Sequence, residues 1–532
     1  MRKLLWVVAV VALVLTVAAP AMALDFKFGA EYRVRFYDYV NTGFDSSNGA
    51  GATLTQNANN TGAVSTRGNP RGVQIRVRPR FDVSDDNGNI QATIRFEYGD
   101  TDFGGTGGAN GSSFGNAQSG ISLDSRGNRT GNGAGGGIGS DGVALETKWA
   151  YLDFAMPWGV PLRIRAGVQP WYLPKGLVID DDAAGVRAYG TVKPVTYEAF
   201  WYRANHGPAT SAAPPSGAIG QPGFDSTRDD ALDYYGGSIN VAIAPFFNPG
   251  AYFVYGDNRA NCVASAGAGN TTFTPPPCTT SRVRPQWFAG ATITGKVGIV
   301  DYDLDFVYGY AKGGTTGSLG QASGGFARGV NFASGNPNDP VKVKGWAADA
   351  GIHIPFGPLK FNILGTYATG DKQNGGDSEA YPLGPGPSWS GSGGQYELIG
   401  EGGTFDVVSM TQHSPTGLWM AGLTVEYVPV KVLWIKAAYG YAAFTTGKAN
   451  CGVIVAGSSC FGPVYTGKPG DEIGSPTATG NGGGKTGLGH EVHIRADYTI
   501  WTGFKVQGLA GYLFPSAGDT ASKYILQLYY NF

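Results

Sequence analysis

The sequence has little charge of either sign and no long hydrophobic run after its first residues. Charged residues make up 15% of the chain, and the formal net charge is −1 at pH 7. A balanced chain of this kind offers no basic surface for nucleic acid and carries no acidic tail. Since no later apolar run approaches the length of a spanning helix, we expect a mature protein without transmembrane helices.

The one long apolar run lies at the N-terminus. Two basic residues precede an apolar stretch from Leu4 to about Ala19, and small residues follow it up to Ala23. This pattern is typical of a secretory signal peptide cleaved after Ala23. A membrane anchor is the alternative, although the run is shorter than the roughly 20 residues that a spanning helix needs. We expect residues 1–23 to be the signal peptide and residues 24–532 to form one exported domain.

Cysteine is scarce, and its four copies fall into two local pairs. Cys262 and Cys278 share one stretch rich in Gly, Ser and Pro, and Cys451 and Cys460 share another. In an exported protein this spacing predicts two loop-closing disulfides, Cys262–Cys278 and Cys451–Cys460. A metal site is the alternative, but no CxxC spacing or nearby histidine supports it.

The sequence also lacks the motifs of a catalytic site in the context that they need. GSSFG at residues 111–115 matches the letters of GxSxG, but it lies in a Gly-rich connector and not at the strand-to-helix turn of a hydrolase nucleophile. The segment GHEVH holds His490 and His493, but a strand places them on opposite faces, whereas a zinc site of this type needs helical spacing. On such a strand Glu491, His493, Arg495 and Asp497 share one face instead. We therefore expect no enzymatic activity, no metal and no cofactor.

What the sequence does contain is a period-two alternation of apolar and polar residues. In VQIRVRPRFDV, residues 73–83, apolar side chains alternate with polar and basic ones. This spacing predicts strands with one apolar and one polar face, in about eighteen runs of roughly ten residues. The 86 glycines and the 12% of aromatic residues fit short strands and long loops better than helices.

The connectors between these runs alternate strictly between short and long. DDNGN at residues 85–89 and VPVK at residues 428–431 are two of the short turns. Short periplasmic turns that alternate with long extracellular loops are typical of an outer-membrane barrel, which must close because lipid cannot satisfy backbone groups. We therefore predict an all-β fold, a closed antiparallel transmembrane β-barrel of about 18 strands, with 16 as the alternative count. A soluble secreted β-protein is the other fold considered.

The polar faces of the early strands are rich in arginine. A charged residue that faced lipid at the midplane would cost about 2–4 kcal/mol, so the polar face of a barrel strand must face the lumen. The predicted basic wall of the lumen, named so below, consists of Arg33, Arg35, Arg76, Arg78, Arg80, Arg95, Arg163 and Arg165. A solvated face of a soluble sheet is the alternative interpretation.

Acidic residues concentrate elsewhere. Two groups are predicted to line or constrict the pore: Asp301, Asp303 and Asp305 on the polar face of one strand, and Asp180, Asp181 and Asp182 in a short connector. A connector that carries carboxylates and folds inward opposite the basic wall would create a transverse field and a constriction. A solvated loop explains the second group equally well.

The last strand ends on an aromatic residue. In KYILQLYYNF, residues 523–532, apolar residues alternate up to Phe532. The segment resembles the C-terminal signal by which the assembly machinery recognises bacterial outer-membrane barrels. A buried core strand that ends at the terminus is the alternative.

Several segments resemble the eighteen-stranded outer-membrane porins of the alginate-export-like group, which are relatives in architecture of the OprD-type porins. The matching segments are LRIRAGVQPW at 162–171, AGVRAYG at 184–190, TYATGD at 366–371, GLWMAGLTVEYVP at 417–429 and residues 487–516. The sequence departs from the family where Gly167, Val168 and Gln169 stand in place of Gly-Arg-Gln. The resemblance implies a channel with an arginine-lined lumen that suits a sugar acid, a carboxylate or an inorganic oxyanion.

These observations favour an outer-membrane porin for passive or substrate-selective diffusion of small hydrophilic, anionic solutes. The alternatives are an alginate-like polysaccharide export channel and a plugged barrel that acts as a surface anchor or receptor. Expected partners are outer-membrane lipids, small hydrophilic solutes and the barrel-assembly machinery, with a homo-oligomer left open. The sequence does not name the solute or the ion selectivity.

Overall fold

The computed structural model describes most of the expected exported domain. The described residues are 24–40, 71–103, 122–123, 129–130, 145–157, 159–205, 232–258, 284–312, 342–370, 379–382, 384, 389–400, 415–445, 487–515 and 520–532. The expected signal peptide and the expected disulfides Cys262–Cys278 and Cys451–Cys460 lie outside these residues.

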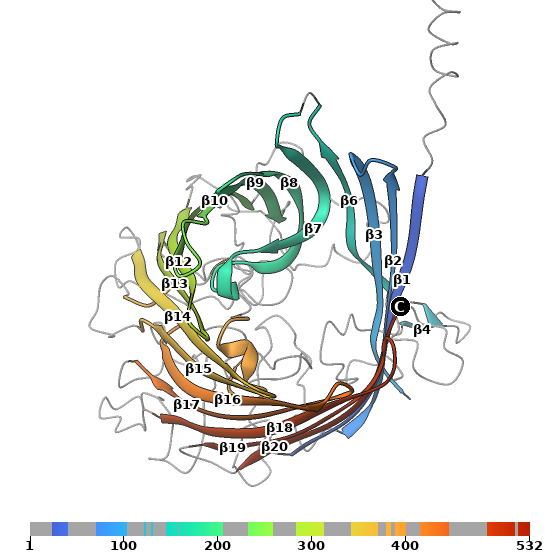
Figure 1. The fold of residues 1–532 in the computed structure, drawn as a ribbon, viewed down its shortest axis with the longest axis vertical. Helices are drawn as coiled ribbons and strands as arrows, with labels where there is room; N and C mark the ends of the chain where they lie inside the picture. Colours follow the sequence, from blue (N-terminus) through green and yellow to red (C-terminus); the bar gives the residue numbers. More distant parts are fainter. Residues whose placement is uncertain are drawn as a thin grey trace, which may run out of the picture.

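Eighteen strands form one closed antiparallel barrel (Figure 1). They are β1 (Leu24–Val40), β2 (Arg71–Asp85), β3 (Ile90–Asp102), β6 (Leu145–Ala155), β7 (Arg163–Tyr172), β8 (Asp180–Val192), β9 (Val195–Asn205), β10 (Leu232–Val241), β11 (Asn248–Asn258), β12 (Arg284–Val297), β13 (Val300–Lys312), β14 (Lys342–Phe356), β15 (Leu359–Ala368), β16 (Leu418–Val430), β17 (Leu433–Phe444), β18 (Gly487–Trp501), β19 (Phe504–Pro515) and β20 (Ala521–Asn531). A separate hairpin joins β4 (Ser122–Leu123) and β5 (Arg129–Thr130). The predicted barrel and its strand count of 18 are confirmed.

The barrel closes where the last strand meets the first. Each barrel strand pairs with its sequence neighbours, and β20 pairs with β1, with Val34 opposite Leu528 on one side and opposite Ile75 on the other. The terminal Phe532 exchanges two backbone hydrogen bonds with Ala30, at 3.1 and 3.2 Å. Closure leaves the sheet without a free edge, which is the requirement for a sheet surrounded by lipid. Recognition of Phe532 by an assembly machinery stays a prediction.

The short turns at one end of the barrel have the expected geometry. The turns between β12 and β13 and between β14 and β15 each contain a glycine with positive φ, 61° at Gly298 and 58° at Gly357. Two-residue hairpin turns need this left-handed conformation because it matches the twist of the paired strands, and glycine adopts it without strain. The predicted tight turns are therefore present.

The two faces of each strand have opposite chemistry. On β1, Phe36 on the outer face is 43% exposed, whereas its neighbour Arg35 on the inner face is 0% exposed. The same contrast holds on β18, where Ile494 is exposed and Glu491 is buried. The barrel therefore turns large apolar side chains outward and encloses ionisable ones, which is the reverse of a soluble protein.

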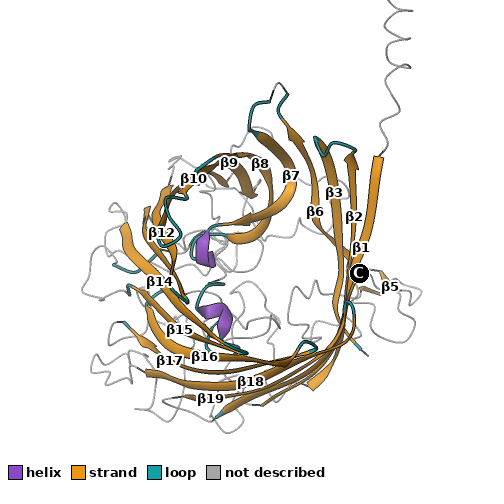
Figure 2. Cartoon of the chain, viewed as in Figure 1, coloured by secondary structure: helices purple, strands orange, loops and turns teal. Residues whose placement is uncertain are grey.

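Helical structure in the described residues is limited to two single turns, η1 (Pro174–Gly176) and η2 (Gly393–Gln395). Among these residues no helix is long and apolar enough to cross a membrane. Figure 2 shows both turns inside the barrel, where they belong to two connectors that return into the lumen. We name residues 173–179 the short inner loop, and residues 379–382, 384 and 389–400 the long inner loop.

The apolar core lies inside the barrel. Buried residues of both inner loops, including Leu177, Trp389 and Leu398, pack in one cluster with inner-face residues of the barrel such as Phe288 and Val307. The interior therefore has two kinds of surface, one packed against loops and one lined by the basic wall.

Candidate solute pathway

The basic wall lies on the inner face of the barrel, but its arginines are not isolated charges. Glu31 on β1 lies between two arginines from neighbouring strands, with Oε1 3.1 Å from Arg76 Nη2 and Oε2 3.3 Å from Arg95 Nη2. Arg78 forms an ion pair with Glu97 on β3. Arg80 pairs with Asp82 at 2.8 Å and completes this group.

The structure therefore places the six arginines that the basic wall has on β1, β2 and β3 beside three carboxylates, Glu31, Asp82 and Glu97. Arg33 and Arg35 are the most deeply buried of the six. Ion pairing across neighbouring strands reduces the cost of placing many like charges side by side. The wall is thus a mixed ladder of arginines and carboxylates.

Arg163 and Arg165 form a separate pair on β7. Both guanidinium groups donate to Asp153 on β6, at 2.7 and 2.8 Å from their Nε atoms. The hydroxyl of Tyr189 on β8 donates to the same carboxylate at 2.5 Å. A single buried acid therefore holds two arginines in place.

Aromatic rings cover part of the arginine ladder. The guanidinium carbon of Arg95 lies 4.5 Å from the ring centre of Trp149, and that of Arg80 lies 5.4 Å away. Trp149 Nε1 in turn donates to Asp182 at 2.9 Å. Stacking of this kind orients the arginines while it leaves their edges available.

The three aspartates at 180–182 do not form the predicted inward connector. They are the first residues of β8, and Asp181 lies opposite Trp171 of β7. The segment that folds inward is the apolar one just before them, in which Leu177 and Val178 are fully buried. The physical reason is that burial against the inner face stabilises apolar side chains, whereas carboxylates would lose their hydration there.

Asp301, Asp303 and Asp305 share the inner face of β13, and each has a different partner. Asp301, near the turn, pairs with Lys296 at 3.2 Å. Asp303 contacts Lys175 of the short inner loop and lies 2.7 Å from His353 Nε2. Asp305 is fully buried and accepts a hydrogen bond of 2.9 Å from a tyrosine hydroxyl of β11.

The two inner loops contact each other inside the barrel. The backbone N–H groups of Trp389 and Gly391 donate to the carbonyls of Gly176 and Lys175, at 3.2 and 3.0 Å. Within the described residues, Lys175 and Trp389 are the two non-glycine residues with positive φ, 62° and 47°. This conformation costs about 1–2 kcal/mol for a residue with a Cβ atom, so the contact between the loops must offset it.

Two tyrosines hold the long inner loop through their hydroxyls. Tyr381 donates to the carbonyl of Leu177 at 3.0 Å, and Tyr396 donates to the carbonyl of Tyr439 on β17 at 3.2 Å. Burial raises the pKa of both phenols above the ordinary value. Both hydroxyls therefore remain protonated donors at neutral pH.

Asp349 on β14 anchors one end of the long inner loop. Its buried carboxylate accepts hydrogen bonds from the backbone N–H and the hydroxyl of Ser392, at 3.0 and 2.9 Å, and from Trp389 Nε1 at 3.3 Å. Thr366 donates to it at 2.5 Å, and Lys175 Nζ lies 3.4 Å away. One wall carboxylate thus contacts both inner loops.

Glu491 on β18 anchors the other end. Three consecutive backbone N–H groups of the loop, those of residues 397, 398 and 399, donate to its carboxylate at 2.7, 3.0 and 2.7 Å. His493 Nδ1 lies 2.8 Å from the same carboxylate. Lys523 and Lys436 complete the attachment, since each donates to a loop carbonyl at 2.9 Å.

The shared face of Glu491, His493, Arg495 and Asp497 was predicted, but the long inner loop was not. Its signal in the sequence is the group Trp389, Tyr396, Leu398 and Ile399 within a connector otherwise rich in Gly and Ser. Large apolar residues in such a connector indicate a segment that packs, because exposed loops rarely retain them. Asp153 was also missed, although its position opposite Arg165 follows from the hairpin register.

Comparisons with known proteins give a likeness of fold. No protein-family model and no curated protein matches the sequence. Among solved structures, OccK8 (OprE) of Pseudomonas aeruginosa is 13% identical, with 96% of this chain and 98% of that chain covered and a TM-score of 0.48. The outer membrane protein opdK of Pseudomonas aeruginosa is 10% identical, with the same shares covered and a TM-score of 0.45. A BenF-like porin from Pseudomonas fluorescens Pf-5 is 9% identical, with 95% and 98% covered and a TM-score of 0.45.

The sequence analysis expected a likeness to OprD-type porins, and these matches agree with it. They do not support the expected likeness to alginate-export porins. Identities and TM-scores this low do not transfer a solute or a mechanism from those proteins to this chain. Both must be argued from the residues of the barrel itself.

Proposed function

We propose that the protein is a bacterial outer-membrane channel through which small hydrophilic anions diffuse. The observation that carries the proposal is the inversion of the barrel, with apolar side chains exposed outside and ion-paired arginines enclosed inside. An exposed apolar belt on a closed sheet is stable in lipid, and enclosed charges are stable where ion pairs, hydrogen bonds or water replace their hydration. The two faces together fit a water-filled pore across the outer membrane.

The basic wall supports a preference for anions. Arg76, Arg78, Arg80 and Arg95 form ion pairs with Glu31, Asp82 and Glu97, and Arg163 and Arg165 share Asp153. Arg33 and Arg35 add two further buried arginines to the same inner face. A lumen with an excess of fixed positive charge concentrates anions, and low-dielectric walls strengthen the effect. Small carboxylates, sugar acids and inorganic oxyanions are the solutes that this charge suits.

The inner loops support a limit on solute size. They lie inside the barrel and are attached to its wall at Asp349 and Glu491. A polysaccharide exporter needs a wide and continuous lumen, so these buried attachments disfavour the export alternative. A plugged anchor differs from the proposed channel in a measurable way, because it would conduct little current.

The test is the reversal potential of the purified, refolded protein in planar bilayers under a salt gradient. We expect a stable conductance with anion preference. Substitution of Arg76, Arg78 and Arg80 by Gln should lower the local anion concentration by roughly tenfold at low salt, since each unit charge about 8 Å away contributes about 0.5 kcal/mol in water, and the anion-to-cation permeability ratio should fall by at least that factor.

The matched control is Lys193→Gln, which removes a positive charge from the turn between β8 and β9, outside the basic wall. The control should keep the selectivity of the unmodified channel. Correctly folded barrels that conduct no current would refute the channel, and an unchanged ratio in the triple variant would refute the role of the arginines.

A further inference from the structure

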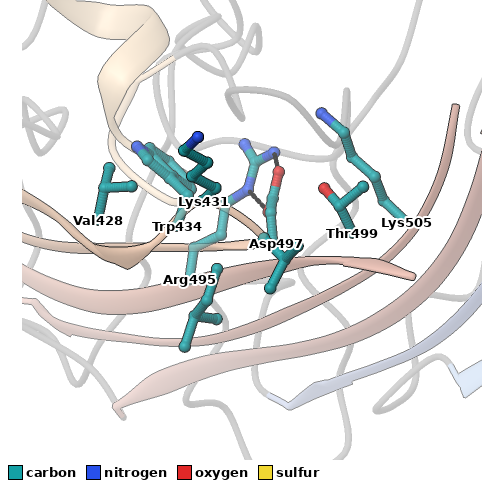
Figure 3. A pocket seen from close by; sticks show the side chains of 9 residues that line it. Val428, Lys431, Trp434, Arg495, Asp497, Thr499 and Lys505 are labelled. Carbon is teal, nitrogen blue, oxygen red and sulfur yellow. Dashed lines mark hydrogen bonds and ion pairs between the residues drawn. The ribbon is translucent and has the colours of Figure 1, made fainter. Parts of the chain in front are cut away.

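A second group of charged side chains lies in the lumen near the short turns, outside the basic wall and the inner loops (Figure 3). It lines a cavity of about 390 Å³ formed by the adjoining ends of β16, β17, β18 and β19. The lining residues are Val428, Lys431, Val432, Leu433, Trp434, Arg495, Asp497, Thr499 and Lys505. Nothing in the proposed conduction path requires this group.

The carboxylate in the cavity is already satisfied. Arg495 binds Asp497 through two hydrogen bonds, from Nε to Oδ1 and from Nη2 to Oδ2, each at 2.8 Å. Gln507 Nε2 donates to the same carboxylate at 2.7 Å. Asp497 therefore has little capacity left to neutralise other cations.

The two lysines of the cavity are unpaired. Within the described parts of the chain, neither Lys431 nor Lys505 has a hydrogen bond or an ion pair. In Figure 3 their ammonium groups stand on either side of the Arg495–Asp497 pair and point to the same side of the wall. The cavity thus presents two uncompensated positive charges and the hydroxyl of Thr499.

One wall of the cavity is flat and held in place. Trp434 Nε1 donates to Glu426 at 3.1 Å, and the guanidinium carbon of Arg495 lies 5.1 Å from the ring centre of the tryptophan. Val428 lies beside the indole and adds apolar surface (Figure 3). A fixed indole ring beside an apolar side chain suits a ligand that carries a compact ring or another small apolar group.

We propose that this cavity binds a phosphate monoester that carries a compact ring or apolar body. The phosphate group has a charge of about −1.5 to −2 at neutral pH, which matches two ammonium groups, whereas a carboxylate would neutralise only one. Lysine binds phosphate as a point charge, and a threonine hydroxyl adds a donor. Since a water occupies about 30 Å³ in the liquid, the cavity is larger than a bare phosphate ion needs.

The proposal rests on the proposed channel only for the route by which the ester reaches the cavity. Binding is therefore measured directly, by equilibrium dialysis of the refolded full-length protein in detergent. The probe is phenyl phosphate, and inorganic phosphate, benzoate and phenol are its comparison ligands. Heat-dependent gel mobility verifies that each variant is folded.

We expect phenyl phosphate to bind more tightly than benzoate, inorganic phosphate or phenol. Lys431→Gln and Lys505→Gln should each weaken binding roughly fivefold, the upper range for a solvent-exposed ion pair. The control is Lys296→Gln, which changes a lysine at the end of β12, beside the turn to β13, and should leave binding unchanged.

Equal affinity for benzoate, or unchanged affinity in the folded double variant, would overturn the phosphate site. If inorganic phosphate bound as tightly as phenyl phosphate, the ring or apolar group of the ester would not be required for binding. Phenyl phosphate binding by a barrel without conductance would refute the channel and keep the site, whereas conductance without binding would refute the site alone.

Discussion

The two halves of the barrel interior use charge in different ways. On the basic wall, charged side chains bind one another from different strands, as Arg76 of β2 and Arg95 of β3 do with Glu31 of β1. In the packed half, buried carboxylates bind the backbone of a returning loop, as Glu491 does with three consecutive N–H groups. The same alternation of residues therefore yields an ionic surface in one half and an anchoring site in the other.

The difference teaches that the presence of a returning loop decides the role of an inner-face charge. A carboxylate that accepts several backbone hydrogen bonds remains ionised despite burial, because those bonds replace its hydration. An arginine beside water needs no such replacement and can also attract a solute. Variants that change one half while the other half stays intact test this division.

The largest effect is expected from Glu491→Ala, which removes the acceptor of three loop N–H groups and of His493. Loss of one partner from a buried charged network costs about 3–5 kcal/mol, so amide exchange at Leu398 and Ile399 should accelerate by about 100-fold or more. Hydrogen exchange measured by mass spectrometry detects the change.

The matched control for this variant is Asp497→Ala, on the same strand and face, whose bonds go to side chains. It should leave exchange in the long inner loop unaltered. If Glu491→Ala also left that exchange unaltered, the division between anchoring and ionic halves would fail.

A smaller effect is expected from Asp153→Asn on the ionic side. The substitution removes the negative charge shared by Arg163 and Arg165 and keeps the size of the side chain. One unit charge about 8 Å away in water changes the local anion concentration by a factor of about 2 and the cation concentration by the inverse factor, so the anion-to-cation permeability ratio should rise by about fourfold at most. Reversal potentials at low salt measure it, and an unchanged anion preference would show that the pair does not face the solute path.

The smallest effect is expected from Lys296→Ala at the short turn. Its ion pair with Asp301 spans 3.2 Å, but the two side chains are 52% and 46% exposed. Exposed pairs of this kind contribute about 0–1 kcal/mol to stability. The free energy of unfolding, measured by urea titration in lipid vesicles, should therefore fall by less than 1 kcal/mol. If Lys296→Ala lowered the free energy of unfolding by about 3–5 kcal/mol, the cost expected for Glu491→Ala, burial would not control the strength of these ion pairs.

Much of the barrel could be predicted from local pattern. Alternation in VQIRVRPRFDV gives the strand and its two faces, and tight turns such as DDNGN give the hairpins. The shared face of Glu491, His493, Arg495 and Asp497 follows from the same rule. These predictions succeed because side-chain direction in a strand depends only on position along it.

The candidate site was less predictable. The position of Asp180–Asp182 at the start of β8 depends on where pairing with β7 begins, and the inward fold of Leu177 and Val178 depends on an apolar surface that several strands build together. Neither can be read from one segment.

The sequence by itself thus determined that strands alternate, that they are about eighteen in number, and which side chains share a face. Only the tertiary structure decided which charges meet, because ion pairs such as Glu31–Arg95 join residues 64 positions apart. It also decided that the connector with Trp389 returns to the wall, since burial of that segment depends on the closed barrel around it. Period and turn chemistry are local properties of the chain, whereas the burial and pairing of charges depend on closure of the whole sheet.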